Sequence, residues 1–175
     1  MRTFLVASVS LIASAFALSG VAAAAEVPPC TGSFSQKTIY SGQGSIEALI
    51  VGGGGTLFAS GGDATQSTLR AYTKGKADPE TVATGNPGGG GLAWNGKRLL
   101  WGYGDLLANG LTGDLDPTAG LYSVNVAAKK KSLVSDTLGM ANGVARGKDG
   151  YIYASNNLGL KLDWITPDGD TENGW

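Results

Sequence analysis

The residues of this chain that could do chemistry are carboxylates, amides and one thiol, because the 175-residue sequence contains no histidine. The absence of imidazole excludes Ser–His–Asp triads, histidine general bases and histidine-ligated metals from these residues. Cys30 is the single cysteine. With no histidine to activate it, we expect a buried or capping thiol rather than a nucleophile.

One segment has the spacing of a phosphate-binding P-loop. Gly91–Lys97 has two glycines five positions apart and a following lysine. Arg98 stands where Ser or Thr must hold magnesium, Trp94 adds bulk inside the loop, and a strand-like run follows instead of a helix. The segment therefore predicts a strand that ends in an Asn-Gly hairpin.

Runs of one residue type also indicate turns rather than ligand sites. Gly52–Gly55 and Gly88–Gly91 lack the spacing of a dinucleotide fingerprint, so they predict turns and close backbone packing. Lys129–Lys131 lies between two predicted strands, where charge discourages edge pairing. We expect a charged turn there and no nucleic-acid or lipid site.

Carboxylates near the end of the sequence resemble the start of a calcium loop. Asp168, Asp170 and Glu172 alternate, but Asn173 occupies the position that requires glycine. A solvated hairpin turn is the expectation for this segment.

Composition and the N-terminus indicate the compartment and the partners. Thirteen Lys and Arg balance fourteen Asp and Glu, so no basic face for nucleic acid is expected. Arg2, the apolar run Phe4–Leu18 and the small residues Val21–Ala25 predict a signal peptide at 1–25, with a retained anchor as the alternative. We expect a secreted protein, extracellular or periplasmic, with no membrane contact after cleavage. A small-molecule substrate is compatible with the composition, which does not indicate the oligomeric state.

The remainder of the chain repeats one pattern of short β-rich runs. Gly55, Gly96 and Gly150 each precede such a run, and they lie 41 and 54 residues apart. Other short apolar runs flank each of these segments, and Leu106–Pro117 has the character of an insertion. Four short strands that recur every 40 to 50 residues are typical of a β-propeller blade.

The repeat predicts an all-β fold, a β-propeller of four-stranded antiparallel blades. About three blades of six are expected, as the N-terminal part of a longer ring, since closed propellers have roughly four to eight. A flat β-sandwich is the competing fold. Phe34–Tyr40 is a possible ring-closing outer strand. The expected organisation is a signal peptide at 1–25, an N-terminal segment at 26–45 and a partial propeller at 46–175, with blades at about 46–87, 88–138 and 139–175.

Part of the third repeat resembles a known family. Gly139–Ala145, Asp149–Asn156 and Leu162–Gly169 resemble the Asn-Gly segment, the Asp-Gly turn with its strand, and the third strand of a blade of the gluconolactonase family. That family includes senescence marker protein and luciferin-regenerating enzyme. The resemblance implies a six-bladed propeller and a divalent-metal-dependent hydrolase of a lactone or related cyclic ester.

The resemblance also implies a metal site. Glu47 stands where the family carries a glutamate ligand in its first blade, and Asn142 matches a family asparagine at the site. The implied cofactor is a divalent cation, calcium, zinc or manganese, which would polarise a carbonyl and activate water. Met140 stands two residues before Asn142, where sugar-acid lactonases often carry arginine.

Other polar and aromatic residues on the repeats have structural or functional roles to consider. Asp105, Asn156 and Asn157 follow predicted second strands, where they either line the channel or, as we expect, cap loops. The aromatic residues expected to pack between blades are Phe58, Trp94, Trp101, Tyr151 and Tyr153. Two functions therefore stay open: the metal-dependent hydrolase, and a non-catalytic secreted propeller of the NHL-repeat or strictosidine-synthase kind that binds a partner on one face.

Overall fold

The structure is a computed structural model of the chain that describes residues 32, 33, 35 and 37–174. The predicted signal peptide, its cleavage site, Cys30 and Phe34 lie outside the described residues. The chain divides into two units, Met1–Lys37 and Thr38–Trp175, and every element described below belongs to the second.

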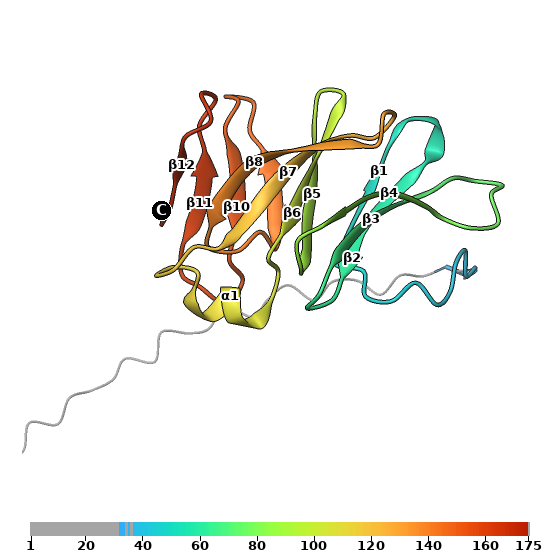
Figure 1. Ribbon diagram of the computed structural model, residues 1–175. Helices are drawn as coiled ribbons and strands as arrows, with labels where there is room; N and C mark the ends of the chain where they lie inside the picture. Colours follow the sequence, from blue (N-terminus) through green and yellow to red (C-terminus); the bar gives the residue numbers. More distant parts are fainter. Residues whose placement is uncertain (1–31, 34, 36, 175) are drawn as a thin grey trace, which may run out of the picture. The chain divides into compact units, whose positions relative to one another are not determined.

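Three four-stranded antiparallel sheets follow one another along the second unit (Figure 1). The first sheet contains β1 (Ala48–Val51), β2 (Leu57–Gly62), β3 (Ser67–Tyr72) and β4 (Glu80–Gly85). The second sheet contains β5 (Gly89–Asn95), β6 (Arg98–Tyr103), β7 (Ala119–Asn125) and β8 (Lys130–Leu138). The third sheet contains β9 (Gly143–Arg146), β10 (Ile152–Ser155), β11 (Leu162–Ile165) and β12 (Thr171–Glu172).

Each sheet is a meander in which sequential strands are neighbours. The all-β prediction is therefore confirmed, and each repeat contributes one sheet. The fourth strand of the third sheet, β12, was not predicted, because its two residues show no alternation of their own. None of the three sheets closes on itself.

Short helical turns interrupt the strands at two places. The helix α1 (Leu107–Thr112) lies within the segment Leu106–Pro117 that the repeat spacing marks as an insertion. The 3-10 turn η1 (Gly53–Gly55) joins β1 to β2, with φ of 67° at Gly54 and 74° at Gly55. These left-handed angles favour glycine, so the first glycine run forms the predicted turn.

The second glycine run lets backbones of neighbouring sheets approach each other. The Gly91 N–H donates to the Ala141 carbonyl at 2.9 Å, although the two residues belong to different repeats. A Cβ on Gly90 would overlap the same carbonyl oxygen, and one on Gly89 would meet the Gly61 backbone. The predicted backbone crowding is confirmed, since only glycine fits between the first strands here.

The P-loop-like segment is a strand and a hairpin, as predicted. Gly91–Asn95 lies in β5, and β6 begins at Arg98 after the two-residue turn. Asn95 pairs with Arg98, so Gly96 is the first residue of the turn, and its φ of 60° favours glycine there. No helix follows the turn to complete a phosphate site.

Aromatic residues fill the core between the first and second sheets. Trp101 is fully buried, and its indole Nε1–H donates to the Ser60 hydroxyl at 2.9 Å across the two sheets. Phe58 meets Trp94 edge-on, with ring centroids 5.7 Å apart. The prediction that these aromatic residues pack between sheets is confirmed for Phe58, Trp94 and Trp101.

Aliphatic residues fill the core between the second and third sheets. Leu100, Leu121 and Leu138 of the second sheet are fully buried against Ile152 and Ile165 of the third. Burial of each such side chain contributes about 1.5–3 kcal/mol. The second sheet is therefore covered on both faces.

Two tyrosines lie at the third sheet, Tyr151 just before β10 and Tyr153 within it. Tyr151 and Tyr153 stack with ring centroids 6.4 Å apart. Because successive residues of a strand alternate between faces, Tyr153 points away from the second sheet that Ile152 and Ala154 contact. Their packing between blades stays a prediction.

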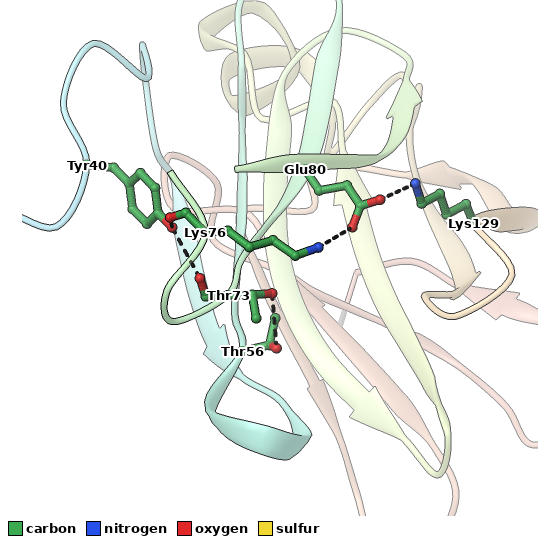
Figure 2. Close-up of polar contacts among 6 residues, drawn as sticks. All are labelled: Tyr40, Thr56, Thr73, Lys76, Glu80 and Lys129. Carbon is green, nitrogen blue, oxygen red and sulfur yellow. Dashed lines mark hydrogen bonds and ion pairs between the residues drawn. The ribbon is translucent and has the colours of Figure 1, made fainter. Parts of the chain in front are cut away.

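Coil residues before β1 lie against the first sheet. The Tyr40 ring contacts Tyr72 with centroids 4.7 Å apart, and its hydroxyl donates to the Lys76 carbonyl at 3.0 Å (Figure 2). Residues 37–40 form no strand. The ring-closing role of Phe34–Tyr40 stays a prediction, since Phe34 and Gln36 lie outside the described residues.

Candidate functional site

Glu47 and Asn142 occupy the same position in two different sheets. The Glu47 N–H donates to the Ser60 carbonyl at 2.9 Å, just before Ala48 pairs with Ser60. The Asn142 N–H donates to the Ser155 carbonyl at 3.2 Å, just before Gly143 pairs with Ser155. Each residue thus immediately precedes the first strand of its sheet, one position before the strand in which the sequence places it.

The second sheet offers no side chain at this position, because its first strand begins with glycines. The carboxylate of Asp105, which follows the end of β6, lies near this position instead. Asp105 follows that strand, and its N–H donates to the Gly88 carbonyl at 3.2 Å. The Asn142 Nδ2 then donates to the Asp105 Oδ2 at 2.9 Å, which joins the second and third sheets.

The pKa of Asp105 responds to burial, to Asn142 and to Glu47. Burial raises the pKa of the Asp105 carboxyl, the hydrogen bond from Asn142 lowers it, and the negative charge of Glu47 raises it further. The net direction is upward. The half-buried Asp105 carboxylate therefore experiences the charge of an exposed acid from another sheet, which disfavours its own negative charge.

The Glu47 carboxylate is exposed and held by one local contact. The Ser45 hydroxyl donates to the Glu47 Oε1 at 2.6 Å. This bond leaves Oε2 for other partners and orients the side chain without burying it. We name Glu47, Asp105 and Asn142 the polar cluster.

The structure thus joins one predicted ligand, Asn142, to Asp105 by a hydrogen bond, while the other, Glu47, acts on Asp105 through its charge. The sequence did place Asp105 after a second strand, but loop capping was preferred for it there. Its hydrogen bond to Asn142 joins residues 37 positions apart. The only available signal was an acidic residue at the end of a strand, followed by an insertion.

Asn156 has the loop-capping contacts expected of it. It is buried, its Nδ2 donates to the Gly110 carbonyl at 3.0 Å and to Asp114 at 3.2 Å, and its Oδ1 accepts from the Leu158 N–H. These bonds fasten the β10–β11 loop to α1. Asn157 beside it is exposed.

The calcium-loop-like segment is a closed hairpin turn, as predicted. The Thr166 N–H donates to the Asp170 carbonyl at 2.8 Å, and the Gly169 N–H donates to the Thr166 carbonyl at 3.0 Å. Gly169 has a φ of 99°. The backbone N–H and carbonyl groups that form these two bonds are thus used within the turn itself.

The donor set of the polar cluster fits a hard divalent cation. It has two carboxylates and an amide whose Nδ2 is already used, which leaves the Asn142 Oδ1 as a third oxygen. A cation would also offset the two causes that raise the pKa of Asp105, which are burial and the negative charge of Glu47. Within the described part of the chain, no group of three or more His, Cys, Asp or Glu side chains is placed to hold a metal. The cluster would thus bind a cation with only two acidic ligands, and water would complete the shell.

Comparisons with family models and with curated proteins assign no family to the chain. No protein-family model matches the chain, and no curated protein matches it. Among the described residues, no helix is long and apolar enough to cross a membrane.

Proposed function

We propose that the three sheets are blades of a β-propeller related to the gluconolactonase family. The proposal is supported by the meander order of every sheet and by the Gly91–Ala141 hydrogen bond, which joins β5 to the segment just before β9. The equivalent positions of Glu47 and Asn142 also support it, since a ring places such positions around one axis.

On this basis the protein is a secreted hydrolase of a lactone or related cyclic ester that uses a divalent cation. The observation that carries the proposal is the hydrogen bond that joins Asn142 to Asp105 across two sheets, supported by the effect of the Glu47 charge on Asp105. The three residues would hold the cation through oxygen atoms. When bound, such a cation polarises a carbonyl and lowers the pKa of water.

The residues of the cluster have distinct tasks in this proposal. Asn142 fixes the Asp105 carboxylate through its hydrogen bond, and Ser45 fixes Glu47. Met140 is buried, so its position offers no group to a sugar-acid substrate.

The proposal is tested by cation titration and by hydrolysis of a lactone panel. Glu47→Gln and Asp105→Asn keep the size of each side chain and remove its charge. We expect each to weaken binding of calcium, zinc or manganese by about 10–100-fold, and to remove hydrolysis. Isothermal titration calorimetry of the mature protein measures the first effect. Asp168→Asn, in an exposed turn, is the matched control and should change neither quantity.

The outcomes separate the two candidate functions. Cation binding that depends on both acids, without hydrolysis of any γ- or δ-lactone, would favour the non-catalytic binding propeller. Equal cation affinity in wild type, Glu47→Gln and Asp105→Asn would contradict the site itself.

A further inference from the structure

Four of the eight asparagines in the sequence stand directly before glycine. The pairs are Asn95–Gly96, Asn109–Gly110, Asn142–Gly143 and Asn173–Gly174. Because glycine has no side chain, its backbone nitrogen can approach the amide carbon of the preceding asparagine with little hindrance. Asparagine is thermolabile in proteins, and this attack is one route by which its amide is lost. The four pairs are alike in sequence, so their surroundings in the structure decide which of them reacts.

The glycine nitrogen is hydrogen-bonded in three of the four pairs. The acceptors are the Leu106 carbonyl for Gly110 at 2.9 Å, the Ser155 hydroxyl for Gly143 at 3.0 Å and the Asp163 Oδ1 for Gly174 at 3.1 Å. A nitrogen that donates such a bond points toward its acceptor and away from the amide carbon. The bond must therefore break in a local opening before the nitrogen can attack.

Two of these three pairs are also held through the asparagine side chain. The Asn142 Nδ2 donates to the Asp105 Oδ2 at 2.9 Å, and the Asn173 Nδ2 donates to the Thr137 carbonyl at 2.7 Å. Both amide groups are thus fixed in orientation. In Asn109 the backbone is fixed instead, because the residue lies within α1.

The fourth pair lies at the hairpin between β5 and β6. Asn95 pairs with Arg98, and Gly96 is exposed in the turn between them. Within the described part of the chain, neither the Asn95 side-chain amide nor the Gly96 N–H has a hydrogen-bond partner. A Cβ added to Gly96 would meet no atom within 4 Å. The turn therefore has free space in which the Gly96 nitrogen can move toward the Asn95 side chain.

We propose that Asn95 is a site of spontaneous deamidation. The Gly96 nitrogen forms a bond to the side-chain carbonyl carbon of Asn95, and the bond from that carbon to the amide nitrogen breaks. The amide nitrogen leaves as ammonia with the proton of the Gly96 N–H, and a five-membered succinimide ring remains. Water then adds to either ring carbonyl and breaks its bond to the ring nitrogen, which leaves aspartate or isoaspartate at this position. The reaction needs water as its co-reactant and transfers no electrons.

The modified residue lies beside a contact between the first two sheets. The preceding residue, Trp94, donates its indole N–H to the Val51 carbonyl at 2.9 Å and meets Phe58 edge-on. Either product places a carboxylate next to Lys97 at the turn. In isoaspartate the main chain continues through the side-chain carbon, so it is longer by one atom and no longer fits the two-residue turn. This inference is independent of the proposed propeller and of its metal.

Peptide mapping by mass spectrometry tests the proposal, because trypsin places each pair on a separate peptide. These peptides are 77–97, 99–129, 132–146 and 162–175. The folded protein is incubated in mildly alkaline buffer, and conversion of each amide to the acid is followed with time. We expect Asn95 to convert about tenfold faster than the other three, which must first lose a hydrogen bond. In urea the four rates should converge, because the local structure is lost.

A variant and its matched control check the assignment by ion-exchange chromatography. Asn95→Gln lengthens the side chain, so that the five-membered ring cannot form, and it should remove the more acidic species that accumulates in the wild type. Asn157→Gln changes an exposed asparagine that no glycine follows and should leave that species unchanged.

Three results would overturn the proposal. They are conversion of any other pair as fast as Asn95 in the folded protein, an Asn95 that converts in urea but not in the folded protein, and an acidic species that persists in Asn95→Gln. The peptide map of the wild type decides between the first two and the expected result even if the variant does not fold.

Discussion

The Ser60 hydroxyl accepts the hydrogen bond of the indole N–H of Trp101, the most deeply buried aromatic residue among those described. Trp101 is fully buried, and its Nε1–H has the Ser60 hydroxyl as its acceptor. Ser60→Ala would leave a buried donor without a partner, which costs about 1–3 kcal/mol. We expect urea denaturation to show this loss in the free energy of unfolding. Thr118→Ala, at an exposed residue, should stay within about 0.5 kcal/mol of wild type. An equally small change for Ser60→Ala would contradict the assigned role.

The ion pair of Glu80 with Lys129 contributes to stability in a pH-dependent way. The hydrogen bond and the charge of Lys129, followed by the charge of Lys76, lower the pKa of Glu80 (Figure 2). A lowered folded-state pKa stabilises the protein above the unfolded-state pKa, and the contribution is lost as the pH falls through the folded value. The free-energy difference between wild type and Glu80→Gln should therefore be present at pH 7 and absent at pH 2.

The same pair should respond to salt. Glu80 and Lys129 are exposed, so 1 M sodium chloride should reduce the difference at pH 7. Urea denaturation of wild type and Glu80→Gln at pH 7, at pH 2 and at pH 7 with 1 M sodium chloride measures this free-energy difference. A difference that persists at pH 2 would point to packing rather than charge.

The polar cluster shows where sequence reasoning at the residue scale ends. Glu47 and Asn142 could be selected because each stands at a recognisable place in its repeat. Asp105 could not be grouped with them, because its contact with Asn142 depends on how the second sheet packs against the third. The register within a sheet is local, whereas the packing between sheets is set by many side chains together.

At the scale of elements, β5 packs closely against the segment that precedes β9. Gly90→Ala would place a methyl group on the Ala141 carbonyl oxygen, so β5 and that segment must separate. Such overpacking costs typically about 1–3 kcal/mol. Thermal or urea unfolding should show the loss. Gly53→Ala is a matched control, since a Cβ there has no neighbour within 4 Å, and we expect a change within about 0.5 kcal/mol. Equal stability of the two variants would contradict the close approach.

Most strands were predictable because their signals are local. The Asn-Gly, Asp-Gly and Pro-Asp-Gly turns mark where chains reverse, and Gly96, Gly150 and Gly169 all have positive φ. β12 escaped prediction because two residues cannot show a period. The position of α1 was expected only as an insertion. Its six residues are held by the Asn156 and Asp114 contacts rather than by helical periodicity.

At the scale of the whole molecule, the second sheet explains the apolar run in the middle of the sequence. Leu99, Leu100 and Trp101 are consecutive and fully buried, because one sheet covers each face of β6. Strands buried on both faces have continuous apolar runs rather than alternation. The repeat spacing therefore predicted the number of sheets, while the closure of a ring needs contacts beyond those in one repeat.

The meander order of the sheets also bears on how the chain acquires its structure. Every strand pairing joins neighbours in the sequence, so the first sheet has all of its partners once Gly85 has been synthesised. Pairings of low sequence separation form quickly, and parts of a chain that emerge first can fold first. Each sheet can thus assemble on the ribosome in turn, and the aromatic core between the first two sheets is complete before β9 exists.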